Sequence, residues 1–139
     1  MKELIDMLHA GEYSCVIANG ERIRTFTRRG VADLYDLLVQ EPEFLHGASV
    51  ADKVVGKAAA SLMALGGVQQ VYAHTISQPA LHLLQKAGIT VNCDEVVDHI
   101  INRDHTGWCP LEQASRELQS AKEIFLVIEN FISSQRKNT

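Results

Sequence analysis

The spacing of apolar residues along the chain predicts a series of short helices and strands. Apolar positions share one face of a helix over residues 2–10. Residues 13–18 are mostly apolar and predict a buried strand, and Asn19-Gly20 is a strong signal for a β-hairpin turn. Residues 22–27 then alternate between polar and apolar side chains, which is typical of a half-exposed strand. The chain is therefore expected to open with a helix and a β-hairpin.

Helical spacing returns after the hairpin. Residues 31–40 place their leucines on one side of a helix, and Pro42 is expected to end that helix. Residues 43–50 are expected to form a loop or a short turn.

The segment over residues 53–65 is small, apolar and rich in alanine, which is typical of a helix buried against a sheet. Ser49 or Asp52 is the expected N-cap of this helix, since both side chains can accept from free backbone N–H groups. Gly66-Gly67 is expected to end it.

Shorter elements follow in close order. The sequence predicts a strand over residues 71–74, a helix over 79–86 and a strand over 89–92. Residues 94–106 are harder to assign, although their first apolar positions have helix-compatible spacing. A final helix is expected from Pro110, as its first residue, to about Ser133.

The order of these elements predicts a single α/β domain over residues 1–139, with its core at about 10–130. Alternating helices and strands joined by short links imply crossover connections and parallel strands. Together with the opening hairpin they give a mixed sheet with helices on both faces.

Composition and charge exclude several classes of protein. The formal net charge is −4, so no broad basic field is available to bind nucleic acid. The three cysteines are scattered and form no Cys-x-x-Cys motif, which excludes a disulfide framework and a common zinc or redox motif. No apolar run approaches the roughly 20 residues of a membrane span, and the N-terminus has no signal-peptide pattern. We expect a cytoplasmic protein without a membrane segment.

The segment from Ser77 to Ile89, which ends in Ala-Gly-Ile, resembles the second-motif helix of cytidine deaminases. Counted back from Gly88, the two cysteine ligands of that motif would fall at Ser77 and Ala80. Lys57 or its neighbours would stand where the other zinc motif, His-x-Glu, belongs. The chain resembles more closely a bacterial family of unknown function that is grouped with this fold. The residues that carry this likeness are Val55-Gly56-Lys57-Ala58-Ala59-Ala60, Tyr72-Ala73, Ala87-Gly88-Ile89, Asn102-Arg103 and Cys109-Pro110-Leu111-Glu112.

This resemblance implies a fold and a pocket position, but no reaction. The fold would be a cytidine-deaminase-like three-layer sandwich. A deaminase zinc needs three protein ligands, a water and a glutamate that moves protons. The two helix starts offer none of these, so hydrolytic deamination, a metal ion and a cofactor are not expected.

An anion pocket is the first functional hypothesis. Two helix N-termini would still converge on the lost metal position, where free N–H groups and helix dipoles attract anions. Lys57 would add a positive charge, Thr75 and Ser77 hydroxyl groups, and Arg103 a bidentate fork beside Asn102. The ligand would be a small anionic or nucleotide-like molecule. The alternative is that Gly56 and the alanines only allow close packing, with Lys57 reaching solvent.

A thiol enzyme acting on a small metabolite is the second hypothesis. Cys109 precedes the expected first helical residue, where a helix dipole lowers the pKa of a thiol. Glu112 is close enough in sequence to serve as an acid or base, Trp108 could border the pocket, and His105 could pair with the thiol. The alternative is a structural helix start with Cys109 as a small buried residue.

The six histidines form no His-x-x-x-His metal motif. His74 ends a predicted strand, where ligands often lie in α/β folds, but an ordinary core or surface histidine is the preferred interpretation. The acidic residues Asp94, Glu95 and Asp98 are interpreted as a solvated loop.

The last helix provides the third hypothesis, a non-catalytic interaction or regulatory module. This helix has more apolar surface than is needed to cover the sheet, and the excess predicts a homo-oligomer that forms through the helix. The residues concerned are Ile124, Phe125, Ile128 and Phe131.

Overall fold

The computed structural model describes residues 1–28, 31–100, 110–115, 117–118 and 120–137. The strands are β1 (Cys15–Asn19), β2 (Arg22–Phe26), β3 (Ser49–Val55), β4 (Gln70–Ser77) and β5 (Thr90–Val97). The helices are α1 (Lys2–Ala10), α2 (Ala32–Gln40), α3 (Pro42–Leu45), α4 (Lys57–Gly66), α5 (Gln78–Lys86), α6 (Pro110–Ala114) and α7 (Ala121–Lys137).

The strands form one mixed sheet in the order β2-β1-β3-β4-β5. Strand β1 is antiparallel to β2 and also to β3, whereas β3, β4 and β5 are parallel to one another. The helices α4 and α5 are the crossovers that parallel neighbours require. The expected hairpin followed by parallel strands is confirmed.

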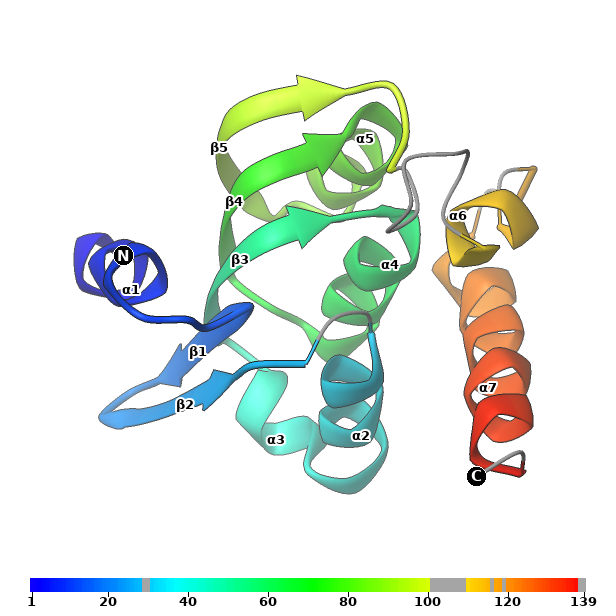
Figure 1. Ribbon diagram of the computed structural model, residues 1–139, viewed down its shortest axis with the longest axis horizontal. Coiled ribbons are helices and arrows are strands. Elements are labelled where there is room, and N and C mark those ends of the chain that lie inside the picture. The colour runs from blue at the N-terminus through cyan, green and yellow to red at the C-terminus, as the bar shows by residue number, and fades with distance from the viewer. Residues whose placement is uncertain (29–30, 101–109, 116, 119, 138–139) are drawn as a thin grey trace.

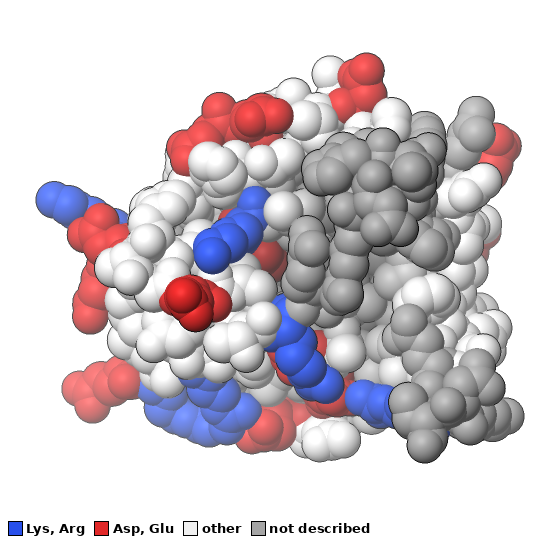
Figure 2. Space-filling view, viewed as in Figure 1, with Lys and Arg blue, Asp and Glu red and all other residues white. Residues whose placement is uncertain are grey.

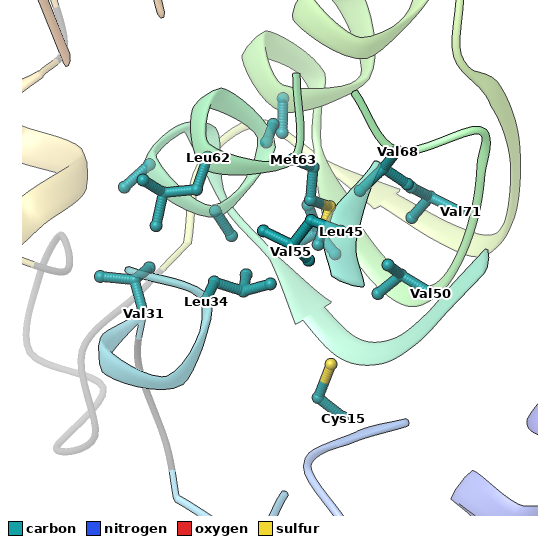
Figure 3. Packing of buried hydrophobic residues seen from close by; sticks show 14 of the residues in the cluster. Cys15, Val31, Leu34, Leu45, Val50, Val55, Leu62, Met63, Val68 and Val71 are labelled. Atoms are coloured by element: carbon teal, nitrogen blue, oxygen red, sulfur yellow. The ribbon is translucent and has the colours of Figure 1, made fainter. Parts of the chain in front are cut away.

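Helices lie on both faces of the sheet (Figure 1). Helix α1 covers one face through a small cluster of Leu4, Leu8, Val16, Ala51 and Tyr72. The other helices that pack on the sheet cover the opposite face and enclose the larger core. Figure 3 shows how valines of β3 and β4 meet side chains of α3 and α4 in this core. The sheet is therefore the middle of three layers.

The central strand β3 is the largest error of the sequence analysis. Residues 49–50 were expected in a loop and residues 53–65 in a helix, but Ser49–Val55 is a strand and the helix begins only at Lys57. Polar and apolar residues do not alternate along this strand because both of its faces are covered. Val50 lies in the larger cluster and Ala51 in the smaller one. Neither Ser49 nor Asp52 caps a helix, because the N-cap of α4 is Gly56.

Three further boundaries differ from the prediction. Helix α2 ends at Gln40, just before Pro42 as expected, but Pro42 also begins α3, where its missing N–H costs nothing, in a segment expected to be a loop or turn. Residues 94–97 continue β5 rather than starting a helix. The expected final helix is divided into α6 and α7.

The apolar stripe of the last helix is largely used within the chain. Ile124 and Ile128 are fully buried in the larger core, and Phe125 and Phe131 are half-buried against it. Leu126 of this helix is exposed, at 59%. The homo-oligomer stays a prediction.

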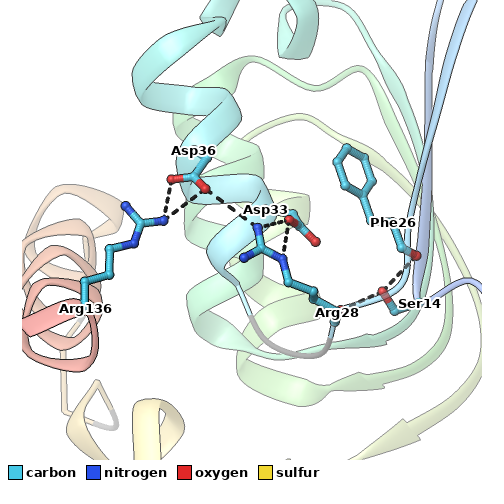
Figure 4. Close-up of polar contacts among 6 residues, drawn as sticks. All are labelled: Ser14, Phe26, Arg28, Asp33, Asp36 and Arg136. Carbon is cyan, nitrogen blue, oxygen red and sulfur yellow. Dashed lines mark hydrogen bonds and ion pairs between the residues drawn. The ribbon is translucent and has the colours of Figure 1, made fainter. Parts of the chain in front are cut away.

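Charged side chains tie distant parts of the chain to α2 (Figure 4). Arg28, after the hairpin, bonds Asp33 in the first turn of α2, with Nε 2.9 Å from the carboxylate. Arg136, near the end of α7, donates to both oxygens of Asp36 at 2.8 and 3.0 Å. Such exposed ion pairs are worth about 0–1 kcal/mol each, so they orient the helices more than they stabilise them. On the face in Figure 2, acidic and basic side chains lie among one another.

Among the described residues, no helix combines the length and the apolar character needed to cross a membrane.

Candidate functional site

The starts of α4 and α5 lie side by side at one edge of the sheet. Val55 ends β3 and pairs with Ile76 of β4, and each strand runs directly into a helix. Gly56 precedes α4 and Ser77 precedes α5, so the two N-caps are neighbours in the register. The convergence that the sequence analysis expected is therefore present, although the strand that leads into α4 was not predicted.

The two helix starts differ in how their free N–H groups are used. At α5, the buried Ser77 accepts a hydrogen bond from the N–H of Ala80 at 3.2 Å. At α4, Gly56 has an extended backbone and provides no side-chain cap. The first turn of a helix has N–H groups without intrahelical partners. The first N–H groups of α4 therefore depend on acceptors other than a side chain of the N-cap residue.

Lys57 lies in the first turn of α4, and its ammonium group contacts the chain itself. Its side chain is buried, with 8% of the residue exposed. The Nζ atom donates to the carbonyl of Ser115 at 3.0 Å and to the carbonyl of Leu118. Ser115 directly follows α6, so the ammonium compensates the partial negative charge at the end of that helix. The alternative in which Lys57 reaches solvent is wrong, and a ligand would have to share this cation with backbone carbonyls.

Asp52 is an ionisable residue that the sequence analysis assigned to the wrong role. It lies in β3 and pairs with Cys15 of β1, on the sheet face that the larger core covers. Its Oδ1 accepts from the N–H of Val54 at 3.3 Å. Burial raises the pKa of this carboxyl group to about 7, and the hydrogen bonds from Val54, Cys15 and Lys53 compensate only in part. A carboxylic acid with this pKa can gain or lose a proton near neutral pH.

The thiol of Cys15 shares this environment. Burial raises its pKa well above the ordinary value, and the negative charges of Asp52 and Asp33 add to the effect. The thiol is therefore protonated and unreactive in the folded chain. The signal for this pair was an aspartate in the apolar run Val50 to Val55, but only the strand assignment reveals its meaning.

The other predicted site residues are only partly described. Thr75 is half-buried in β4, where it pairs with Val54 and Glu95, close to both helix starts. Asn102, Arg103, His105, Trp108 and Cys109 lie outside the described residues, and for Glu112 only the backbone, within α6, is described. The thiol-enzyme hypothesis stays a prediction.

Two open hollows occur away from the starts of α4 and α5. One of about 450 Å³ lies along α1, beside Lys2, Asp6 and Ala10. The other, of about 380 Å³, lies between Leu38, Leu65 and Phe125. In the described part of the chain, no three His, Cys, Asp or Glu side chains are placed to hold a metal ion.

Comparison with known proteins connects the chain to one family. No curated protein matches it. The crystal structure of a DUF1893 family protein from Thermotoga maritima is similar, with a TM-score of 0.85 and 26% sequence identity. The alignment covers 93% of this chain and 87% of that protein. A family described as a domain of unknown function (DUF1893) matches residues 3–132. The chain therefore belongs to the DUF1893 family.

Proposed function

We propose that the chain binds a small anionic, nucleotide-like ligand where α4 and α5 begin, on a cytidine-deaminase-like frame without the zinc motifs. The observation that carries the proposal is the pairing of Val55 with Ile76, which makes the two helix starts neighbours. The carboxyl ends of parallel strands are the usual place for a ligand in open α/β sheets. A helix N-terminus carries roughly half a positive charge, so two of them together favour an anion.

The backbone supplies the direct contacts in this proposal. Gly56 gives the first turn of α4 no capping side chain, and the backbone N–H groups there are the proposed first donors to an anion. The hydroxyl of Ser77 accepts from Ala80 and keeps its own proton to donate. Lys57 contributes positive charge next to the anion while its ammonium holds two carbonyl groups. Arg103, Asn102 and Trp108 belong to the proposal on sequence grounds alone.

The deaminase-like frame is supported by the order of elements. An antiparallel hairpin is followed by β3, α4, β4, α5 and β5 with parallel pairing. In a zinc deaminase the starts of the two helices carry the metal ligands and the catalytic glutamate. Here they carry Gly56-Lys57 and Ser77-Gln78, which cannot form that site. Binding without zinc-dependent deamination is the function that these residues support.

The test is a calorimetric titration of the full chain with inorganic phosphate and with a nucleoside monophosphate. Gln78→Glu adds a negative charge at the exposed first residue of α5, where the helix dipole tolerates it. At about 7 Å and an intermediate dielectric constant this charge should weaken anion binding roughly five- to tenfold. Gln85→Glu makes the same change at the exposed far end of α5 and is the matched control.

Binding that Gln78→Glu weakens and Gln85→Glu leaves unchanged would support the site. No binding of either anion, or an equal effect of both variants, would refute it. If neither anion binds and the chain forms a stable oligomer in solution, the interaction-module hypothesis would be favoured instead.

A further inference from the structure

The helical layer presents an apolar surface that its own chain leaves open. Leu126 of α7 is 59% exposed, and Leu65 near the end of α4 is 37% exposed. Together with Leu38, Lys122 and Phe125 they line the hollow of about 380 Å³, and these five residues form the helix patch. We propose that the helix patch is the contact surface of a homodimer, with a two-fold axis close to Leu126. The dimer does not depend on the proposed anion site.

The available apolar surface of α7 is not the one that the sequence analysis expected. Ile124 and Ile128 are fully buried in the core of their own chain. At 100° per residue, Leu126 lies about 160° around the helix from each of them and therefore points away from the core. Exposed apolar side chains that cluster on a protein surface often mark a contact with another protein.

The helix patch contains both a projecting side chain and a space that can receive one. Leu126 is the most exposed of the four apolar side chains that line the hollow. A two-fold axis brings the same surface of both copies together, so that surface must be complementary to itself. An exposed leucine beside an apolar hollow meets this condition, because each Leu126 can enter the hollow of the other copy.

The charges along α7 favour a second copy of the chain as the partner. Lys122 lies four residues before Leu126 and Glu129 three residues after it, and all three lie within about 60° of one another around the helix. With a rise of 1.5 Å per residue, the lysine is about 6 Å to one side of Leu126 and the glutamate about 4.5 Å to the other. Two α7 helices that cross antiparallel at Leu126 therefore place each Lys122 against Glu129 of the second copy. A parallel crossing would place lysine against lysine.

Both charged groups are available for this contact. In the described part of the chain, Lys122 has no ion-pair partner. Oε2 of the half-buried Glu129 accepts from the hydroxyl of Tyr35 at 3.2 Å, which leaves Oε1 for a second donor. Tyr35 also stacks on Phe125, with ring centroids 5.8 Å apart. These contacts hold the carboxylate in place before association, which lowers the entropy cost of binding.

The dimer is expected to dissociate readily. Leu65 and Leu126 are exposed, whereas Leu38 and Phe125 are half-buried, so the apolar centre of the contact is small. Small interfaces are typical of reversible complexes. We expect a dissociation constant in the micromolar range.

The test is sedimentation velocity of the full chain at concentrations from about 1 μM to about 1 mM. The wild-type chain should pass from monomer to dimer within this range. Leu126→Glu introduces a charge but keeps a good helix former, and it should weaken the dimer at least tenfold. Ile23→Glu makes the same change at a 40% exposed position of the edge strand β2, away from α7 in Figure 1, and should leave the dimer unchanged.

Exchange of the two charges tests the antiparallel arrangement. Lys122→Glu would place two carboxylates in each contact, and Glu129→Lys would place two ammonium groups there, so each should weaken the dimer roughly tenfold. The double variant restores opposite charges and should recover most of the wild-type affinity. Residues seven apart on one helix are separated by about 10 Å, so this recovery cannot come from a pair within one chain.

Four results would overturn the proposal. They are a monomer over the whole concentration range, a dimer that Leu126→Glu leaves intact, an assembly larger than a dimer, and no recovery in the double variant. Circular dichroism of each variant checks that the fold is retained. Recovery of the dimer in the double variant would itself show that neither charge exchange acts by unfolding the chain.

Discussion

Replacement of Asp52 by asparagine tests the unusual proton affinity of the central strand. The amide keeps the size of the side chain and can still accept from the N–H of Val54. It removes the negative charge that burial disfavours. We expect Asp52→Asn to stabilise the fold near neutral pH, which is unusual for a substitution beside a core.

The expected magnitude follows from the pKa of Asp52, which is about 7 in the folded chain against an ordinary value of 3.8. Because the folded pKa is the higher one, the folded state binds more protons between these values, and stability falls as the pH rises from about 4 to about 7. The full shift is roughly three units, or about 4 kcal/mol above pH 7. Partial exposure of the carboxyl group to solvent reduces this cost toward about 2 kcal/mol.

The assay is urea denaturation of the wild-type chain and Asp52→Asn at pH 5 and at pH 8. The advantage of the variant should grow by about 1–2 kcal/mol between these two pH values. Groups such as Asp94, whose pKa is lowered, change stability in the opposite direction but are present in both proteins and cancel in the difference. Asp6→Asn, at an exposed position of α1, is the matched control and should show no such growth.

A stability difference that does not depend on pH would refute this reasoning. It would mean that the carboxyl group of Asp52 ionises in the folded chain as easily as in the unfolded chain. A variant less stable than the wild type at pH 8 would also contradict it.

Three other substitutions or reactions test separate parts of the fold. Lys57→Met should destabilise the chain by about 1–3 kcal/mol in urea denaturation, because it leaves the carbonyl of Ser115 without its cation; unchanged stability would contradict the buried contact. Gly67→Ala should cost about 1–3 kcal/mol by the same assay, because φ is +75° and the added methyl group would meet the ring of His46; a neutral effect would refute this. Cys15 should react with a thiol reagent at pH 7 only when the chain unfolds, since it is buried with a raised pKa. Rapid labelling of Cys15 itself in the folded chain, located by mass spectrometry, would contradict the assignment.

Local signals in the sequence determined the elements that depend on few neighbours. The hairpin turn at Asn19-Gly20 has a specific backbone requirement, and the helices at 2–10 and 31–40 show one apolar face each. For these elements the pattern was readable because one side of the element is polar or the turn residue is restrictive. The meeting of two helix starts was instead implied by the resemblance to the deaminase fold, and the pairing of Val55 with Ile76 agrees with it.

Tertiary structure alone decided the central strand and the roles of its polar residues. Strand β3 is covered on both faces, so its sequence shows no alternation, and the helix assigned there misplaced Asp52. The partners of Lys57 lie 58 and 61 positions away, and His9 is 63 positions from Tyr72. Spacing along a sequence encodes neighbours within one helix or strand. Contacts across such distances depend on how the layers pack, and that packing gives these residues the environments from which their chemistry follows.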